Sequence, residues 1–373
     1  MIVTFDPPEN IGGVEGRLAG YVRELIRTKH FVEVESFSPS HELSSVDFHG
    51  ANLHRCPSSL RHLPQTSQFT LKRLRESRIE SVFLLSGGIT IFGLLLLSYC
   101  RLTHRRNAIL LYGKDVLQAR GRFFGRLLLR VSTSLTDCVF TNSWFTASLV
   151  PFVLRRKIRV LYPGVDPNIA TPTPRSSNPS GKRILFVGRL VERKGVKDLV
   201  DAFRIVSEGV PDVSLEVVGD GPQKSQLESL VADLNMGNRV SFLGTLRGRP
   251  LYERFSSCNV FAMPSITLED DAEGFGTVFL EAGLFGKPSV GTFSGGIPEA
   301  VENNVTGLLV HEGEVAELAL ALRKLLVDEN LARFLGRNAR ERVLRKFTWA
   351  EGTRIILDSL AKSRAGENPR PTR

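Results

Sequence analysis

Residues 260–282 read VFAMPSITLEDDAEGFGTVFLEA: an apolar run, a polar loop with two glycines, and an apolar helical pattern. We predict a strand over Val260–Met263 that ends near Pro264, and a helix opened by Gly274 and Gly276. The free N–H groups at the start of such a helix attract an anion, because the helix dipole is positive there. The stretch therefore predicts a strand–loop–helix unit with an anion site in its loop.

The same alternation of β-rich runs and helical patterns continues along the chain in both directions, which is typical of parallel βαβ units. Further strands are expected at Ile2–Phe5, Val32–Phe37, Ser81–Leu85, Ala108–Tyr112, Asp137–Thr141, Arg183–Val187, Ser214–Val218, Val240–Leu243 and Pro288–Thr292. A length of 373 residues exceeds that of a usual single domain. We therefore predict two doubly wound α/β domains facing a cleft, with ligands at the carboxyl ends of the strands.

One segment interrupts this pattern. Residues 170–181 read ATPTPRSSNPSG, a composition typical of an interdomain linker. We predict an N-terminal domain over residues 1–170, a linker over 171–182, a C-terminal domain over 183–346, and a final helix and tail over 347–373.

Composition limits the class of protein. A hydrophobic fraction of 42% with 24% charged residues indicates a globular, core-forming chain. The four cysteines form no C-x-x-C pair, which excludes a zinc ribbon and a thioredoxin-type motif. The first residues also lack the pattern of a secretory signal, so we expect a cytoplasmic protein.

The positive charge is concentrated in the front half of the chain. Residues 1–170 hold 22 Lys and Arg against 13 Asp and Glu, a net +9, whereas residues 171–373 hold 27 against 26, a net +1. Such a field attracts an anionic partner: nucleic acid, an acidic membrane surface or a phosphorylated substrate. Charge alone does not choose among these three.

A basic amphipathic pattern runs from Val116 to Val131. Arg122, Arg126 and Arg130 recur every four residues, and Arg120 adds to their charge; the apolar set beside them is Phe123, Phe124, Leu127, Leu128 and Val131. Such a helix can lie on an anionic bilayer. It can equally be a core helix with a solvated arginine face, and both interpretations stay open.

Residues 82–100 carry no formal charge over 19 positions, so a membrane-spanning helix has to be considered. Gly87 and Gly88 divide this run where a strand would turn into a helix. We therefore interpret it as a buried strand followed by a core helix.

Two more loops have residue types suited to a nucleoside diphosphate. Arg189 and Lys194 follow the strand Arg183–Val187, and two cations there can neutralise the charge that builds on a leaving diphosphate. The next strand ends in Gly219-Asp220-Gly221-Pro222, which permits a tight turn. This is not G-x-G-x-x-G, which disfavours a nicotinamide-dinucleotide enzyme.

Two glutamates flank the glycines of the opening stretch. Glu281 lies about two turns into the predicted helix, where a carboxylate can accept both hydroxyls of a ribose. Glu273 stands just before the helix and can accept hydrogen bonds from sugar hydroxyls. Gly295-Gly296 offers another backbone cradle, and Gly12-Gly13 joins a strand to a helix near the N-terminus.

Together these motifs resemble, in order and spacing, the family 4 retaining glycosyltransferases. The segments that carry the resemblance are Gly12-Gly13-x-Glu15, Gly188-Arg189-Leu190 with Lys194-Gly195, Gly219-Asp220-Gly221-Pro222, Glu273-Gly-Phe-Gly with Glu281-Ala282, and Gly295-Gly296-Ile-Pro-Glu299. The family has the GT-B architecture of two Rossmann-like domains facing a central cleft. Phe347-Thr348-Trp349 resembles the family's crossover back to the first domain.

The resemblance implies transfer of a hexose from a nucleotide sugar to a glycan or lipid-linked acceptor, with retention, in cell-envelope or glycoconjugate synthesis. A UDP-sugar is the expected donor, although GDP and ADP occur in the family. Arg189, Lys194 and Glu273 are then the catalytic candidates; the donor-binding candidates are Gly12, Gly13, Gly276, Thr277 and Glu281. The family requires no metal or other cofactor, so we expect Glu269, Asp270 and Asp271 to form a solvated loop rather than a cation site.

One position departs from the family pattern. Many members carry a histidine on the acceptor side, where this chain reads Tyr112-Gly113-Lys114-Asp115. Lys114 can supply the positive, hydrogen-bonding role, and Asp115 keeps the acidic position.

Two other functions stay open on the same scaffold: a nucleotide-sugar 2-epimerase, and a non-catalytic basic protein that binds a membrane or nucleic acid. For the transferase we expect no nucleic-acid partner. The alternative to a purely cytoplasmic location is the inner face of the membrane, reached through Arg120, Arg122, Arg126 and Arg130.

Overall fold

A computed structural model describes residues 1–4, 13–38, 44–57, 63–76, 79–86, 89–170 and 181–362 of the chain. The chain divides into two compact units, one made of Met1–Gly164 with the segment from Trp349, the other of Val165–Thr348. Most of the predicted linker, residues 171–180, lies outside the described residues, as does Gly12.

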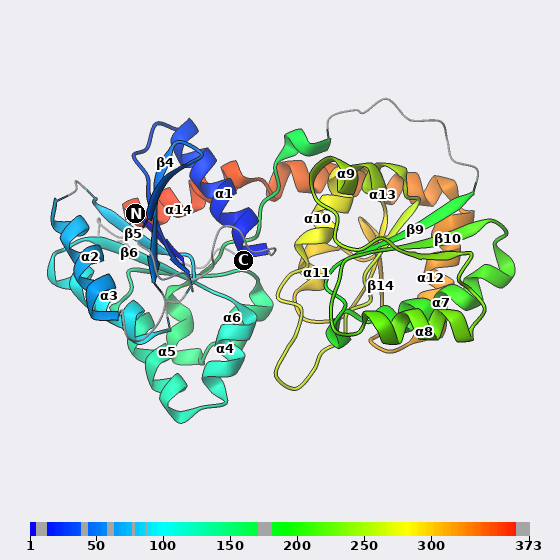
Figure 1. Cartoon of the computed structure of the whole chain (residues 1–373), viewed down its shortest axis with the longest axis horizontal. Helices are drawn as coiled ribbons and strands as arrows, with labels where there is room; N and C mark the ends of the chain where they lie inside the picture. The colour runs from blue at the N-terminus through cyan, green and yellow to red at the C-terminus, as the bar shows by residue number, and fades with distance from the viewer. Residues whose placement is uncertain are drawn as a thin grey trace. The chain divides into compact units, whose positions relative to one another are not determined.

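The first unit is a doubly wound α/β layer structure (Figure 1). Its sheet has the order β3-β4-β2-β1-β5-β6-β7-β8 and is parallel except for the antiparallel pair β3 and β4. The strands are β1 (Ile2–Thr4), β2 (Glu33–Ser38), β3 (Ser44–Phe48), β4 (Ala51–Pro57), β5 (Ser81–Leu84), β6 (Arg106–Leu111), β7 (Cys138–Thr141) and β8 (Ile158–Val160). The helices are α1 (Gly13–Arg27), α2 (Leu63–Glu76), α3 (Ile91–Leu102), α4 (Gly113–Arg120), α5 (Phe123–Leu135), α6 (Trp144–Leu149), the 3-10 helix η2 (Phe152–Lys157) and α14 (Trp349–Lys362).

Alternating residues of these strands form two separate cores. Val3, Ile109 and Leu111 face a core shared with α3, α4 and α5. Their neighbours Ile2 and Leu110 face a core shared with α1 and α14 on the other side of the sheet. The period of two along each strand thus produces the three-layer arrangement.

The second unit has a six-stranded, all-parallel sheet of order β11-β10-β9-β12-β13-β14. Its strands are β9 (Lys182–Val187), β10 (Val213–Val218), β11 (Val240–Phe242), β12 (Val260–Ala262), β13 (Ser289–Thr292) and β14 (Gly307–Val310). Its helices are η3 (Pro167–Ala170), η4 (Glu192–Lys194), α7 (Val196–Gly209), α8 (Lys224–Asp233), α9 (Gly248–Ser257), α10 (Thr277–Leu284), α11 (Ile297–Ala300), α12 (Val315–Val327) and α13 (Glu329–Lys346). The strand order reverses between β9 and β12, and open α/β sheets bind ligands beyond the carboxyl ends of such a pair.

The predicted α/β fold with two parallel-sheet domains is confirmed, and each predicted strand overlaps an observed one. The pattern missed β3, β4, β8 and β14. The apolar run of residues 82–100 forms β5 and α3, as predicted. No helix among the described residues is long and apolar enough to cross a membrane.

The prediction of one helix from Val116 to Val131 is wrong. The chain forms α4 and α5 instead, with a break at Gly121 and Arg122. A Cβ added at Gly125 would lie 2.6 Å from the carbonyl oxygen of Ala119, so the missing side chain lets α5 fold back tightly against the end of α4.

The final helix packs on the first helix of the same unit through a glycine. A Cβ added at Gly20 would lie 2.2 Å from the ring of Trp349, whose ring also makes an edge contact with Tyr21, 5.3 Å between centroids. We expect Gly20→Ala to lower the free energy of unfolding by about 1–3 kcal/mol, because this well-packed contact has no room for a methyl group.

Gly16→Ala on the same helix is the matched control, since no atom of the described residues beyond its chain neighbours and its own helix backbone lies within 4 Å of its added Cβ. It should stabilise the protein by up to ~1 kcal/mol, because alanine is the better helix former. Urea denaturation followed by circular dichroism measures both; equal stability of the two variants would contradict the packing argument.

Candidate active site

The loops after β9 and β12 are in direct backbone contact. Gly195, which follows η4, has a left-handed φ of 64°. A Cβ added there would lie 1.9 Å from the carbonyl oxygen of Pro264, just beyond β12. Only glycine fits this close approach, which places the cations of η4 beside the loop that precedes α10.

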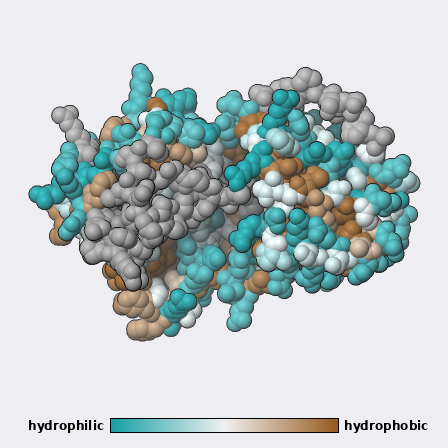
Figure 2. Space-filling view, in the orientation of Figure 1, coloured by the Kyte–Doolittle hydropathy of each residue, from teal (hydrophilic) through white to brown (hydrophobic). Residues whose placement is uncertain are grey.

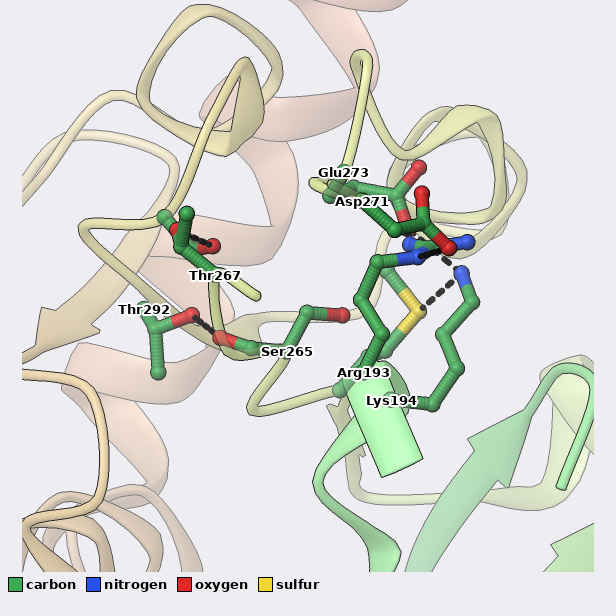
Figure 3. Close-up of polar contacts among 9 residues, drawn as sticks. Arg193, Lys194, Ser265, Thr267, Asp271, Glu273 and Thr292 are labelled. Carbon is green, nitrogen blue, oxygen red and sulfur yellow. Dashed lines mark hydrogen bonds and ion pairs between the residues drawn. The ribbon is translucent and has the colours of Figure 1, made fainter. Parts of the chain in front are cut away.

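Two cations of η4 converge on one carboxylate of that loop (Figure 3). Glu273 Oε2 accepts hydrogen bonds from Lys194 Nζ at 2.5 Å and from Arg193 Nη1 at 2.7 Å. The Nε of Arg193 lies 3.0 Å from Asp271 Oδ2. Since only 12% of the Glu273 side chain is exposed, these contacts are largely shielded from solvent.

The two cations decide the charge of Glu273. Burial alone would raise the pKa of this carboxyl, but Lys194 and then Arg193 outweigh burial and lower its pKa to about 2. Glu273 is therefore an anion at neutral pH and a very weak base. It can accept hydrogen bonds, but it is poorly suited to remove a proton from a sugar hydroxyl.

The structure agrees only in part with what the sequence predicted for the residues around Glu273. The structure brings Lys194 to Glu273, but the prediction of a solvated loop is wrong for Asp271, which is partly buried and paired with Arg193. Glu269 and Asp270 are exposed. The role of Arg193 was missed, because its carboxylate partners lie about 80 positions away and nothing local indicates the pairing.

Arg189 is separate from this ion-pair network. Its side chain is exposed on the loop between β9 and η4, and no ion pair is recorded for it among the described residues. The loop backbone is fixed nonetheless: Leu190 N donates to Asp220 O at 2.9 Å, and a Cβ at Gly219 would lie 1.8 Å from the carbonyl oxygen of Gly188. Arg189 therefore projects from an ordered loop as a cation open to an anion.

Helix α10 begins at the predicted place. Gly276 is its N-cap with a φ of 84°, and Thr277 is its first residue, so their N–H groups belong to the first turn and lack intrahelical partners. Glu281 lies about one turn after Thr277 in α10 and is partly buried. Burial raises the pKa of this carboxyl to about 7.

A glycine pair supports the backbone of Glu273. Gly296 N donates to Glu273 O at 2.8 Å, and a Cβ at Gly295 would lie 2.2 Å from that oxygen. The Gly295-Gly296 turn thus acts as a support for the loop rather than as an open cradle. Beside it, Thr292 Oγ1 donates to Ser265 O (Figure 3).

The acceptor-side candidates belong to the first unit. Lys114 and Asp115 lie in the first turn of α4, where Lys114 is exposed and Asp115 Oδ2 accepts from Tyr112 N at 3.4 Å. Gly13 is the first residue of α1.

Comparison with known proteins gives the family. Residues 172–342 match the glycosyl transferases group 1. The chain is 30% identical, over 94% of both chains, to a Mycobacterium tuberculosis protein named GDP-mannose-dependent alpha-(1-6)-phosphatidylinositol monomannoside mannosyltransferase. This chain belongs to the glycosyl transferases group 1. The predictions of that family and of a hexosyltransferase enzyme are confirmed.

Other relatives agree with this assignment. The glycosyltransferase is 28% identical, over 94% of both chains, to a GDP-mannose-dependent monoacylated alpha-(1-6)-phosphatidylinositol monomannoside mannosyltransferase of Corynebacterium glutamicum. Its fold matches Anabaena HepE in complex with UDP and glucose with a TM-score of 0.75 at 22% identity, covering 96% of this chain and 99% of the other. This structural match confirms the GT-B class of fold.

Replacing Glu281 and replacing Glu273 should change the free energy of unfolding in opposite directions, because folding shifts the two pKa values in opposite directions. The pKa of Glu281 rises on folding from 4.5 to about 7, so its ionisation lowers the free energy of unfolding progressively between about pH 4.5 and pH 7, and the full loss is present above pH 7. We expect Glu281→Gln to raise the free energy of unfolding by up to about 3 kcal/mol near pH 8 and to have little effect near pH 4. Urea denaturation at both pH values measures this.

Glu273→Gln is the control, because it should lower the free energy of unfolding where Glu281→Gln raises it. The pKa of Glu273 falls on folding to about 2, so its contribution to stability is present above about pH 4.5 and is lost as the pH falls toward 2. Near pH 8 this variant should be destabilised by about 3 kcal/mol. Shifts of the same sign in both variants would show that the two carboxyl environments are not as described.

Proposed function

We propose that this glycosyltransferase transfers mannose from GDP-mannose to a lipid-linked glycan acceptor with retention of the anomeric configuration. Similarity over nearly the whole chain to GDP-mannose-dependent mannosyltransferases that act on phosphatidylinositol mannosides carries the proposal. Sequence alone favoured a UDP-sugar. The donor named for these relatives moves the proposal to GDP-mannose.

The donor would occupy the loops at the carboxyl ends of β9 and β12. Arg189, Lys194 and the N–H groups of Gly276 and Thr277 would bind the diphosphate. Glu281 would accept the ribose hydroxyls and Glu273 the hydroxyls of the hexose. Because cations and helix amides supply the positive charge, we propose that no metal is needed.

The proposed acceptor side lies in the first unit. Gly12 and Gly13 would contribute to donor binding, and Lys114 with Asp115 would contact the acceptor. Exposure of the Lys114 side chain supports this role, since it is open to a polar ligand.

The charge of Glu273 limits the mechanism. In the ligand-free protein the pKa of Glu273 is about 2, which makes its carboxylate a weaker base than the terminal phosphate of a leaving diphosphate, whose conjugate acid has a pKa near 6. We therefore propose a front-face substitution in which the donor C1–O bond breaks first and the acceptor hydroxyl gives its proton to that phosphate oxygen. Arg189 and Lys194 would stabilise the charge on the leaving diphosphate.

A lipid-linked acceptor places the reaction at a membrane surface. The four arginines at positions 120, 122, 126 and 130 are all exposed in the first unit, which supports attraction to an anionic leaflet. We propose a cytoplasmic enzyme that works at the inner face of the membrane.

Ligand-observed NMR with GDP-mannose, UDP-glucose and ADP-glucose, without added metal, tests the donor. We expect selective binding of GDP-mannose by the wild type and loss of that signal in Glu281→Ala, which cannot accept the ribose hydroxyls. Lys197→Ala is a suitable control, because Lys197 is exposed and pairs only with Asp201 on α7 among the described residues. Selective binding of UDP-glucose would replace the proposed donor, and equal binding by Glu281→Ala would remove Glu281 from the site.

Replacement of the diphosphate cations tests the mechanism. Arg189→Ala and Lys194→Ala should each lower kcat about a hundredfold, since one preorganised group of this kind contributes roughly 3 kcal/mol to transition-state stabilisation. Transfer of radiolabelled mannose to lipid extract measures the rate, and circular dichroism checks folding. Near-wild-type turnover in both variants would refute the assigned roles; Lys197→Ala again serves as the control.

A further inference from the structure

Helix α5 turns its largest apolar side chains toward solvent. Phe123 is 79%, Phe124 58% and Leu127 48% exposed, and the neighbouring turn adds the exposed Val131. The buried face of α5 instead holds Leu129, Ser132 and Thr133. The interpretation of this segment as a core helix with a solvated arginine face is therefore wrong for these four apolar residues.

The helix beside α5 extends the apolar surface. Ile91, Leu95 and Leu102 of α3 are exposed and, at spacings of four and seven, form one stripe. The opposite sides of α3 and α5 join the same core on the sheet. The two exposed stripes therefore point away from the sheet on the same side of the unit, where Figure 2 shows apolar side chains gathered at the lower edge, over α5.

The 3-10 helix η2 contributes two more apolar side chains. Phe152 is 81% and Val153 70% exposed, and η2 packs against α5. We call the exposed side chains of α3, α5 and η2 the docking surface; they are Ile91, Leu95, Leu102, Phe123, Phe124, Leu127, Val131, Phe152 and Val153. Exposed apolar side chains gathered on neighbouring, packed elements of a folded protein mark an interaction site.

Basic residues are concentrated in the segment that carries the docking surface. Residues 89–157, which contain all three elements, hold 11 Lys and Arg against two acidic residues, Asp115 and Asp137. The four exposed arginines at positions 120, 122, 126 and 130 have no recorded ion pair within the part of the chain that the structure describes. The surface is therefore both apolar and cationic.

We propose that the docking surface seats the enzyme on an anionic phospholipid bilayer, with Phe123 and Phe124 entering the boundary between head groups and acyl chains. Phe123 and Phe124 begin α5 at its corner with α4, a corner kept tight by the contact of Gly125 with Ala119. The arginines bind lipid phosphates while the apolar stripe is buried. This inference deepens the proposed function, on whose lipid-linked acceptor it rests.

The same observations disfavour nucleic acid as the occupant. Phosphate backbones attract arginines but do not require exposed aliphatic side chains, and bases stack on aromatic rings. Ile91, Leu95 and Leu127 have no such use on nucleic acid. Burial in a bilayer accounts for the aliphatic, aromatic and basic residues together.

Co-sedimentation of the full chain with vesicles tests the surface, using phosphatidylcholine alone and with about one third phosphatidylglycerol. We expect binding to the anionic vesicles. The double variant Arg126→Ala/Arg130→Ala should bind about 25-fold more weakly, since each arginine near the surface contributes about fivefold. Phe123→Ser/Phe124→Ser should lose at least tenfold, because its apolar contact is removed.

Matched controls lie on α13 of the second unit. Arg337 and Arg340 are exposed, as is Phe334, so Arg337→Ala/Arg340→Ala and Phe334→Ser should bind vesicles like the wild type. Wild type that binds anionic vesicles no better than phosphatidylcholine would overturn the proposal. The proposal would also be overturned if Phe123→Ser/Phe124→Ser bound anionic vesicles as tightly as the wild type. Binding of the wild type to duplex DNA without binding to vesicles would overturn it as well.

The donor and docking proposals can fail separately. Vesicle binding is measured without nucleotide sugar, and nucleotide-sugar binding by NMR without vesicles. Loss of vesicle binding with intact GDP-mannose binding would count against the docking surface alone. Vesicle binding without any nucleotide-sugar binding would support the surface and count against the proposed donor.

Discussion

The buried ion pair of Glu273 with Lys194 and Arg193 is the interaction on which the loop cluster of the second unit depends. It joins η4, which follows β9, to the loop that follows β12. The strand order of the sheet reverses between β9 and β12, so the carboxylate of Glu273 links the two loops at that point. A largely buried anion is stable there only because two cations compensate for its loss of water. A phosphate that reaches Lys194 therefore competes with Glu273, whereas Arg189 is open from the start.

Glycines make that ion pair possible. Gly195 lets η4 approach Pro264, and Gly295 lets the next loop approach the backbone of Glu273, at distances that no side chain allows. The carboxylate is thus fixed at both ends, by cations at its oxygens and by a backbone hydrogen bond at its carbonyl. Preorganisation of this kind lets charges stabilise a transition state without rearranging first.

Sequence predicted the parts of the protein that depend on local chemistry. Strand positions followed from short apolar runs, and Gly276 with Glu281 followed from a glycine-rich helix start. The pairing of Arg193 with Asp271 could not be predicted, because it joins residues far apart in the chain. Strands β8 and β14, each at the edge of its sheet, were also missed.

Helix α5 shows that a hydrophobic pattern does not predict which face of a helix is buried. Amphipathicity gives two faces of a helix but not which one is covered; that depends on the packing of other elements. Here Leu129, Ser132 and Thr133 pack inward, Gly125 allows the close approach to α4, and the buried hydroxyl of Thr133 donates to the carbonyl oxygen of Leu129 at 2.8 Å. Because folding leaves the phenylalanines of α5 in water, their apolar surface remains available for contacts outside the fold.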